Sequence, residues 1–416
     1  MPELYISDFS YKDYLTYKIK EGDTPDSVAA TMGIDTYRLR NYHNGYAPLE
    51  DCIGPVFPRH LEFLIIKPPE VQLTDEEKEQ HRKYVVFNDS LGKLSLNYSQ
   101  GEHTYGVLYT IENGQETQTL KHEIKVIWLA QDKGYHFYKV IRGHDMYVND
   151  TAVNTMAEKI AHRAGQALYP LIIVVDEDGQ WVDIYNFDEI KKRWQETKTQ
   201  ISKYYKGHFV EKYFSIYDKN LKNKETLFLT LDKDWFLNAL FNGIHIQYPP
   251  TKSKTRKVTF PYLAKAENLT YNAEQVIDER LDVDNLIVID INGKLDDSRA
   301  KTNFENELNL SVKEYSEEKI TGNYKAKYFL NPNNYMPEAF IVSCDLALDN
   351  PQKYTVTVTN LHNTKKLVVA SRQPLFISEH TVKQKSGSSF WYFFIMSILL
   401  LGCIYAFIKY YQFKFK

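Results

Sequence analysis

The residues that could do acid–base chemistry are few and isolated in this sequence of 416 residues. Glu158 and His162 stand four apart in a segment with helical periodicity, so their side chains could share one face. No third partner accompanies them, and we interpret them as a solvated pair. The twelve histidines form no HExxH motif, and the sequence contains no GxSxG, P-loop or GxGxxG motif. We therefore predict no catalytic residue, no cofactor and a protein that is not an enzyme.

Two acidic segments contain the oxygen ligands that a metal ion would need. One runs from Asp290 to Asp297 and the other from Asp176 to Asp178. Each coincides with a predicted hairpin turn, at Asn292-Gly293 and at Asp178-Gly179, and neither has the carboxylate spacing of an EF-hand loop. The three cysteines are far apart, which leaves no CxxC zinc motif and no disulfide framework. The sequence predicts no metal site.

The elements near the N-terminus alternate between strand and helix. A strand-like segment at residues 17–20 leads into a Gly-Asp-Thr turn. Thr24 is the expected N-cap of a first helix, because it offers a side-chain oxygen and precedes a proline at the first helical position. Asp35 or Thr36 is expected to cap a second helix, and a strand returns at Leu61 to Ile66. The predicted order is strand, helix, helix, strand.

This N-terminal segment resembles the LysM family. The resemblance covers about an eighth of the chain. The matching residues are Tyr17, Ile19, Gly22, Asp23, Thr24, Ser27, Val28, Ala29, Leu39, Asn44, Leu64, Ile66, Lys67 and Pro68. The resemblance implies a βααβ fold, in which two helices pack on one face of a two-stranded antiparallel sheet. Since so small a sheet buries little surface, the helices would supply most of the core.

LysM modules commonly bind polymers of N-acetylglucosamine such as peptidoglycan or chitin. Their groove lies between the turn before the first helix and the loop before the last strand. The resemblance places the glycan- or partner-binding residues of this chain at Gly22, Asp23, Thr24, Pro25 and Asn44. Pro25 stands where the family usually has a bulky apolar residue, and the connection from Gly45 to His60 is longer than usual. These departures favour a module that has kept the fold and exchanged sugar for a protein partner.

The fold class predicted for the whole chain is α+β and multidomain. The expected parts are a LysM-like module (1–70), a charged linker (71–83), a mixed α+β region (84–257), a β-rich domain (258–383), a polar hinge (384–389), a single transmembrane helix (390–408) and a basic-aromatic tail (409–416). The mixed region and the β-rich domain are expected to be separate structural blocks.

The last of these parts provides the strongest physical signal. Phe390 to Ile408 contains no charged residue and is long enough to cross the hydrocarbon core as a helix, so membrane lipid is an expected partner. Residues 1–16 lack the basic start and apolar stretch of a signal peptide, so we expect a single-pass membrane protein with cytoplasmic N-terminal domains. The net charge of −3 predicts no nucleic-acid partner.

Together these patterns predict a non-enzymatic, membrane-anchored binding or scaffolding protein with a protein partner. LysM-like modules also occur in baseplate components of contractile phage tails and related injection machines, so a place in a contractile injection or secretion machine is one expectation. The alternative is a peptidoglycan- or chitin-binding envelope protein or secreted effector. In that alternative, the apolar tail inserts into a membrane.

Overall fold

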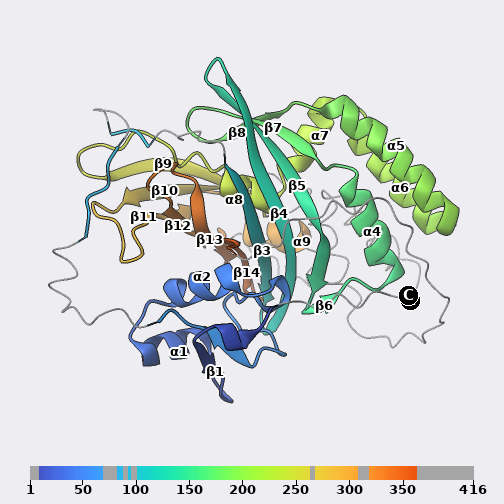
Figure 1. The fold of residues 1–416 in the computed structure, drawn as a ribbon. Coiled ribbons are helices and arrows are strands. Elements are labelled where there is room, and N and C mark those ends of the chain that lie inside the picture. The colour runs from blue at the N-terminus through green and yellow to red at the C-terminus, as the bar shows by residue number, and fades with distance from the viewer. Residues whose placement is uncertain are drawn as a thin grey trace.

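A large antiparallel sheet organises the protein. The computed structural model describes residues 9–68, 82–87, 92–94, 101–262, 268–307 and 318–362. Within these ranges, twelve strands form one sheet in the order β8-β7-β5-β4-β3-β14-β13-β12-β11-β10-β9, with β6 pairing beside β5 (Figure 1). Every neighbouring pair in that order is antiparallel.

The strands of this sheet come from two separate stretches of the sequence. The first stretch supplies β3 (Glu102–Asn113), β4 (Glu116–Asp132), β5 (Tyr135–Val148), β6 (Thr151–Ala152), β7 (Leu171–Val175) and β8 (Trp181–Ile184). The second supplies β9 (Ser253–Phe260), β10 (Leu269–Ile277), β11 (Ile287–Leu295), β12 (Gly322–Leu330), β13 (Pro337–Leu346) and β14 (Gln352–Asn360). A short helix, α9 (Lys301–Glu307), stands between β11 and β12.

The pairing of β14 with β3 joins the two stretches and corrects the predicted fold class. Thr355 lies opposite Thr110, and the ladder continues from Gln352 to Asn360. The prediction of an α+β, multidomain chain with a separate mixed region and β-rich block is wrong, because both blocks belong to one sheet. Pairing also covers two strand edges that separate blocks would have left open.

The predicted transmembrane helix was part of the same fold class. Among the described residues, no helix is long and apolar enough to cross a membrane. The segment Phe390–Ile408, on which that prediction rested, lies outside the described residues.

Helices cover one face of the sheet. They are α4 (Met156–Gln166), α5 (Phe187–Tyr204), α6 (His208–Asn220), α7 (Lys224–Leu231) and α8 (Trp235–Leu240). The strands alternate accordingly: in β10, Tyr271, Ala273 and Gln275 are buried toward these helices while Asn272 and Glu274 between them are exposed. This alternation is the period of two expected for a sheet with one face in the core.

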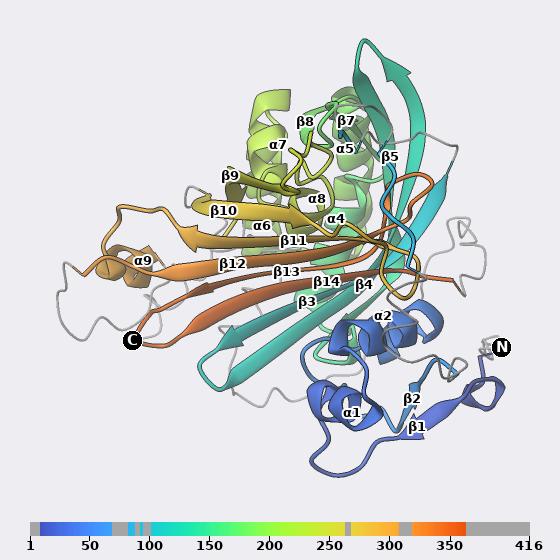
Figure 2. The same ribbon diagram turned by 90° about the vertical axis from the view of Figure 1, so that its left-hand side faces the viewer.

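A small N-terminal module, residues 9–68, lies on the other face. It consists of β1 (Thr16–Lys18), α1 (Pro25–Met32), α2 (Thr36–Tyr46) and β2 (Phe63–Ile65), and β1 pairs antiparallel with β2. Its own core contains Val28, Leu39 and Leu64. In Figure 2 the module lies beside β3, β4 and β14, with α2 nearest the sheet, away from α5–α7. The order of its elements agrees with the sequence pattern.

Local turn signals succeed at some positions and fail at others. Hairpins form at Asn113-Gly114 and at Asp178-Gly179, where each glycine has a positive φ. Asn292-Gly293 is not a turn, because β11 continues through it with Gly293 opposite Ala273. Thr151–Ala152 pair with β5 as β6, so α4 begins after Thr155. Pairing with other strands decides the conformation at both places.

Candidate functional site

The turn before α1 is built from hydrogen bonds within the module. Gly22 adopts a φ of +85°, a conformation that favours glycine. The Asp23 carboxylate accepts hydrogen bonds from the Tyr17 hydroxyl at 2.9 Å and from the Lys20 backbone N–H at 2.8 Å. One oxygen of this carboxylate therefore closes the turn and ties it to β1.

Thr24 and Pro25 form the start of α1. Thr24 Oγ1 accepts from the Ser27 N–H at 3.1 Å, while Ser27 Oγ accepts from the Thr24 N–H at 2.9 Å. This reciprocal pair is a capping box and confirms Thr24 as the N-cap. Pro25 is buried at the first helical position, where its missing N–H leaves no hydrogen bond unmade. Both residues thus have complete structural roles.

Asn44 lies inside α2 and not at its end. Its side chain is 2% exposed and makes two hydrogen bonds to one residue of the following connection, donating to the Ile53 carbonyl at 2.9 Å and accepting from the Ile53 N–H at 2.7 Å. Asn44 is therefore an internal clamp on the connection from Gly45 to His60. It is buried, whereas Gly22 and Thr24 are exposed on the turn.

His43 supports the same connection. Its Nδ1 accepts a hydrogen bond from the Ile65 N–H at 3.0 Å, so Nε2 carries the proton and donates to the Asp51 carbonyl at 3.2 Å. Burial lowers the pKa of His43 to about 4, although the Asp51 carbonyl partly opposes this. The neutral ring thereby joins α2, the connection and β2.

A set of ion pairs holds the module to the sheet. Arg38 of α2 donates to both carboxylate oxygens of Asp284, at 2.8 and 3.3 Å, and Lys67 donates to the same carboxylate at 2.8 Å. Burial raises the pKa of Asp284, but the hydrogen bonds from Arg38 and Lys67 outweigh it and leave that pKa below the usual value. Beside them, Tyr37 packs on Phe329 of β12, with ring centroids 6.2 Å apart.

A buried lysine and a close backbone approach complete this docking surface. Lys121 of β4 is 1% exposed, and its amine donates to the Glu50 carbonyl of the module at 2.5 Å and pairs with Asp150 at 3.0 Å. Gly54 lies so near β3 that an added Cβ would stand 2.8 Å from Cδ2 of Leu108. The surface of β3 under the module therefore leaves no room for a larger side chain at position 54 unless Leu108 moves.

Sequence patterns alone did not find these docking residues. Arg38 and Asp284 are 246 positions apart, and neither belongs to a motif. Lys121 lies on β4 and is 1% exposed because the module covers that face of the strand. The five site residues predicted from the resemblance do not include any of the docking groups.

The interpretation of Glu158 and His162 as a solvated pair is wrong for Glu158. Its side chain is 4% exposed and accepts from the backbone N–H groups of Thr155 at 2.9 Å and Asn154 at 3.1 Å, completing a capping box at the start of α4. His162 is half-buried, and burial lowers its pKa to about 4, with the charge of Arg142 acting in the same direction. Glu158 therefore caps α4, whereas His162 is a half-buried histidine with a lowered pKa.

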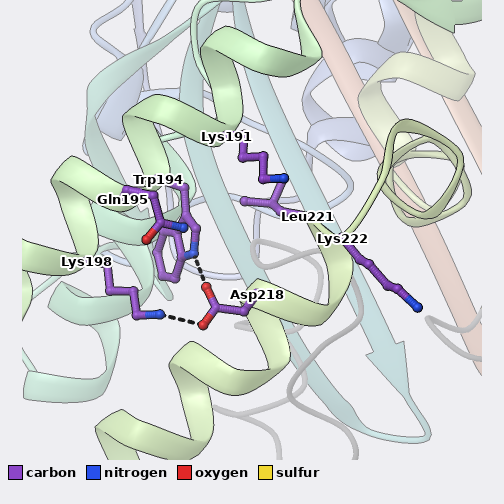
Figure 3. Close-up of a pocket in the computed structure, with 7 residues that line it drawn as sticks. All are labelled: Lys191, Trp194, Gln195, Lys198, Asp218, Leu221 and Lys222. Carbon is purple, nitrogen blue, oxygen red and sulfur yellow. Dashed lines mark hydrogen bonds and ion pairs between the residues drawn. The ribbon is translucent and has the colours of Figure 1, made fainter.

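A shallow basic hollow of about 330 Å³ lies between α5 and α6 (Figure 3). Its one carboxylate, Asp218, accepts from Trp194 Nε1 at 2.7 Å and from the Lys198 amine at 2.5 Å. Lys191 lines the hollow, whereas the Lys222 amine points away from it. Because the lysines do not converge, we assign no ligand to this hollow.

Comparisons with known proteins give no match. No model of a known protein family matches this chain, and no curated protein sequence is similar to it. Within the described ranges, no group of three or more His, Cys, Asp or Glu residues is arranged to hold a metal ion. The resemblance of the module to LysM domains stays a prediction.

Proposed function

We propose that this chain is a non-enzymatic binding or scaffolding protein whose N-terminal module is LysM-like and binds protein in place of sugar. The observation that supports this most directly is the role of Asn44, whose amide clamps Ile53 in the interior. A sugar-binding role would require that amide to abandon two buried backbone groups.

The remaining candidates support the same proposal. Thr24 caps α1 through its hydroxyl, and one Asp23 oxygen already accepts two hydrogen bonds within the turn. Gly22 and Thr24 are exposed on this turn and Asp23 is half-exposed, but the Thr24 hydroxyl and one Asp23 oxygen are already engaged within the module. Polar recognition of a sugar needs several convergent donors and acceptors. In this module most of those groups are engaged in holding the fold together.

The contacts of α2 provide the positive argument. The module meets the sheet through a bidentate Arg38–Asp284 pair, a buried lysine and a glycine fitted against Leu108. Charge pairs at a rim and close packing at the centre are typical of protein–protein contacts. We propose that the module works as a rigid part of a larger binding surface, in a scaffold such as a contractile injection or secretion machine.

Calorimetric titration of the full chain with N-acetylglucosamine oligomers tests this proposal. We expect no saturable binding for the wild type or for Asp23→Ala, and no release of soluble fragments when the protein is incubated with chitin or peptidoglycan. Micromolar binding that Asp23→Ala abolishes would favour the alternative, a peptidoglycan- or chitin-binding envelope protein or effector. Fragment release above that of a heat-inactivated sample would overturn the non-enzymatic assignment.

A further inference from the structure

A second polar cluster lies on the face of the sheet that the helices cover. It shares no residue with the docking surface. It consists of Arg142 on β5, His122 on β4 and His162 on α4, named here the Arg142 cluster. Arg142 is 7% exposed, and its buried Nε has no hydrogen-bond partner. Among the described residues its guanidinium forms no ion pair. The central carbon of the guanidinium, Cζ, lies 5.9 Å from the centroid of the Tyr169 ring. A buried arginine normally has an acceptor.

A β-bulge places Arg142 in this position. His122 and Ile124 of β4 pair with Met146 and Arg142 of β5, so residues 143–145 stand opposite Glu123 alone. The side chain of Gln166 in α4 donates to the Gly143 carbonyl at 2.9 Å and fixes the helix against the bulge. Bulges often re-aim side chains beside functional sites. Here the bulge and its helix bring Arg142 toward His162.

The two histidines also have unmade hydrogen bonds. Nδ1 of His122 and Nδ1 of His162 are buried without a partner. Burial lowers the pKa of both rings, and the positive charge of Arg142 lowers each pKa further, while the neighbouring Glu123 backbone partly opposes this for His122. Both rings are therefore neutral near pH 7, and a neutral imidazole can present an N–H to an acceptor. Three buried nitrogens of one cluster thus lack partners.

The charged groups around the cluster carry both signs. Arg163 and the exposed His144 also act on His162, and both lower its pKa. The buried carboxylate that acts on Arg142 belongs to Asp234, and it accepts from the Leu237 N–H at 2.9 Å as the N-cap of α8. Asp234 has its own structural role and forms no hydrogen bond with Arg142 among the described residues. The guanidinium of Arg142 thus has a charge partner in Asp234, but within the described ranges no hydrogen bond joins the two and its buried Nε stays open to a further acceptor.

We propose that the Arg142 cluster is a binding site for a phosphate-type oxyanion, with Arg142 as the charged donor and His122 and His162 as neutral donors. The planar guanidinium matches the oxygen geometry of phosphate, and neutral imidazoles add hydrogen bonds without further charge repulsion. His162 is half-buried and His144 is exposed, so the cluster comes nearest to solvent on the side of α4. This site is independent of the module and of its proposed function.

Thermal unfolding and calorimetry of the full chain with inorganic phosphate test the proposal. We expect phosphate to raise the melting temperature of the wild type. Arg142→Met should weaken phosphate binding by about 10- to 100-fold, the effect of losing one charged hydrogen-bonding group. In phosphate-free buffer the same variant should melt at or above the wild-type temperature, because it removes a buried charge without a partner. Lys191→Met, in the hollow of Figure 3, is the matched control and should bind phosphate normally.

A purely structural role for Arg142 gives the opposite pattern. In that case Arg142→Met melts well below the wild type, and phosphate shifts both melting temperatures equally. His162→Phe is the second variant, since it keeps an aromatic ring on α4 and removes only the donor; undiminished phosphate binding by it would contradict the assigned ligand set. Phenyl phosphate distinguishes a site for the free ion from a site for a phosphoryl group on a larger ligand. Only a site of the second kind accommodates the phenyl ring. Absence of binding for both probes overturns the proposal.

Discussion

Replacing Asn44 by alanine tests whether its side chain stabilises the connection from Gly45 to His60 or contacts sugar. The substitution leaves the N–H and the carbonyl of Ile53 without partners, in a residue that is 0% exposed. Each buried group that loses its only partner costs about 1–3 kcal/mol, so for the two groups we expect the connection from Gly45 to His60 to lose roughly 2–6 kcal/mol of local stability. If Asn44 instead contacted sugar, stability would change little.

Hydrogen–deuterium exchange measures this local effect without requiring two-state unfolding of the whole chain. At about 1.4 kcal/mol for each factor of ten, amides of the connection should exchange at least about 30-fold faster in Asn44→Ala. Asn303→Ala, at an exposed position of α9, is the control and should leave exchange in the module unchanged. Equal exchange rates in the two variants would refute the clamp.

Three further predictions concern the start of α1 and the docking surface. Thr24→Ala should destabilise the module by about 0.5–2 kcal/mol in the same exchange experiment, whereas Thr24→Ser keeps the capping oxygen and should stay close to wild type. Because the pKa of Asp284 lies below its usual value, the carboxylate stabilises docking above the ordinary Asp pKa and this contribution is lost as the pH falls through the lower folded-state pKa. Asp284→Asn should increase exchange on the module side of the sheet at neutral pH and remove this acid dependence; an unchanged acid dependence would assign it to another group. Gly54→Ala should loosen the module, since its Cβ would stand 2.8 Å from Leu108, and Leu108→Val in the same chain should restore docking. Failure of that rescue would mean that the two residues are not in contact.

The candidate site could be predicted only in part, for a reason that particular residues make clear. Thr24 was identified because an N-cap depends on the next three residues alone. The binding role of Asn44 stays a prediction, and its hydrogen bonds to Ile53 had no sequence signal because Ile53 lies across a connection whose path the sequence does not specify. Arg142 has no sequence signal, because its exceptional feature is the absence of a partner in the folded core.

The sequence by itself determined the local conformations. The capped start of α1 and the hairpins at Asn113-Gly114 and Asp178-Gly179 follow from short-range hydrogen bonds and from the positive φ that glycine tolerates. The tertiary structure decided the continuation of β11 through Asn292-Gly293 and the pairing of β14 with β3. It also decided the docking of Arg38 onto Asp284. Each of these depends on partners that are distant in the chain, and a strand or a charge gains its stabilisation only when such a partner is in place.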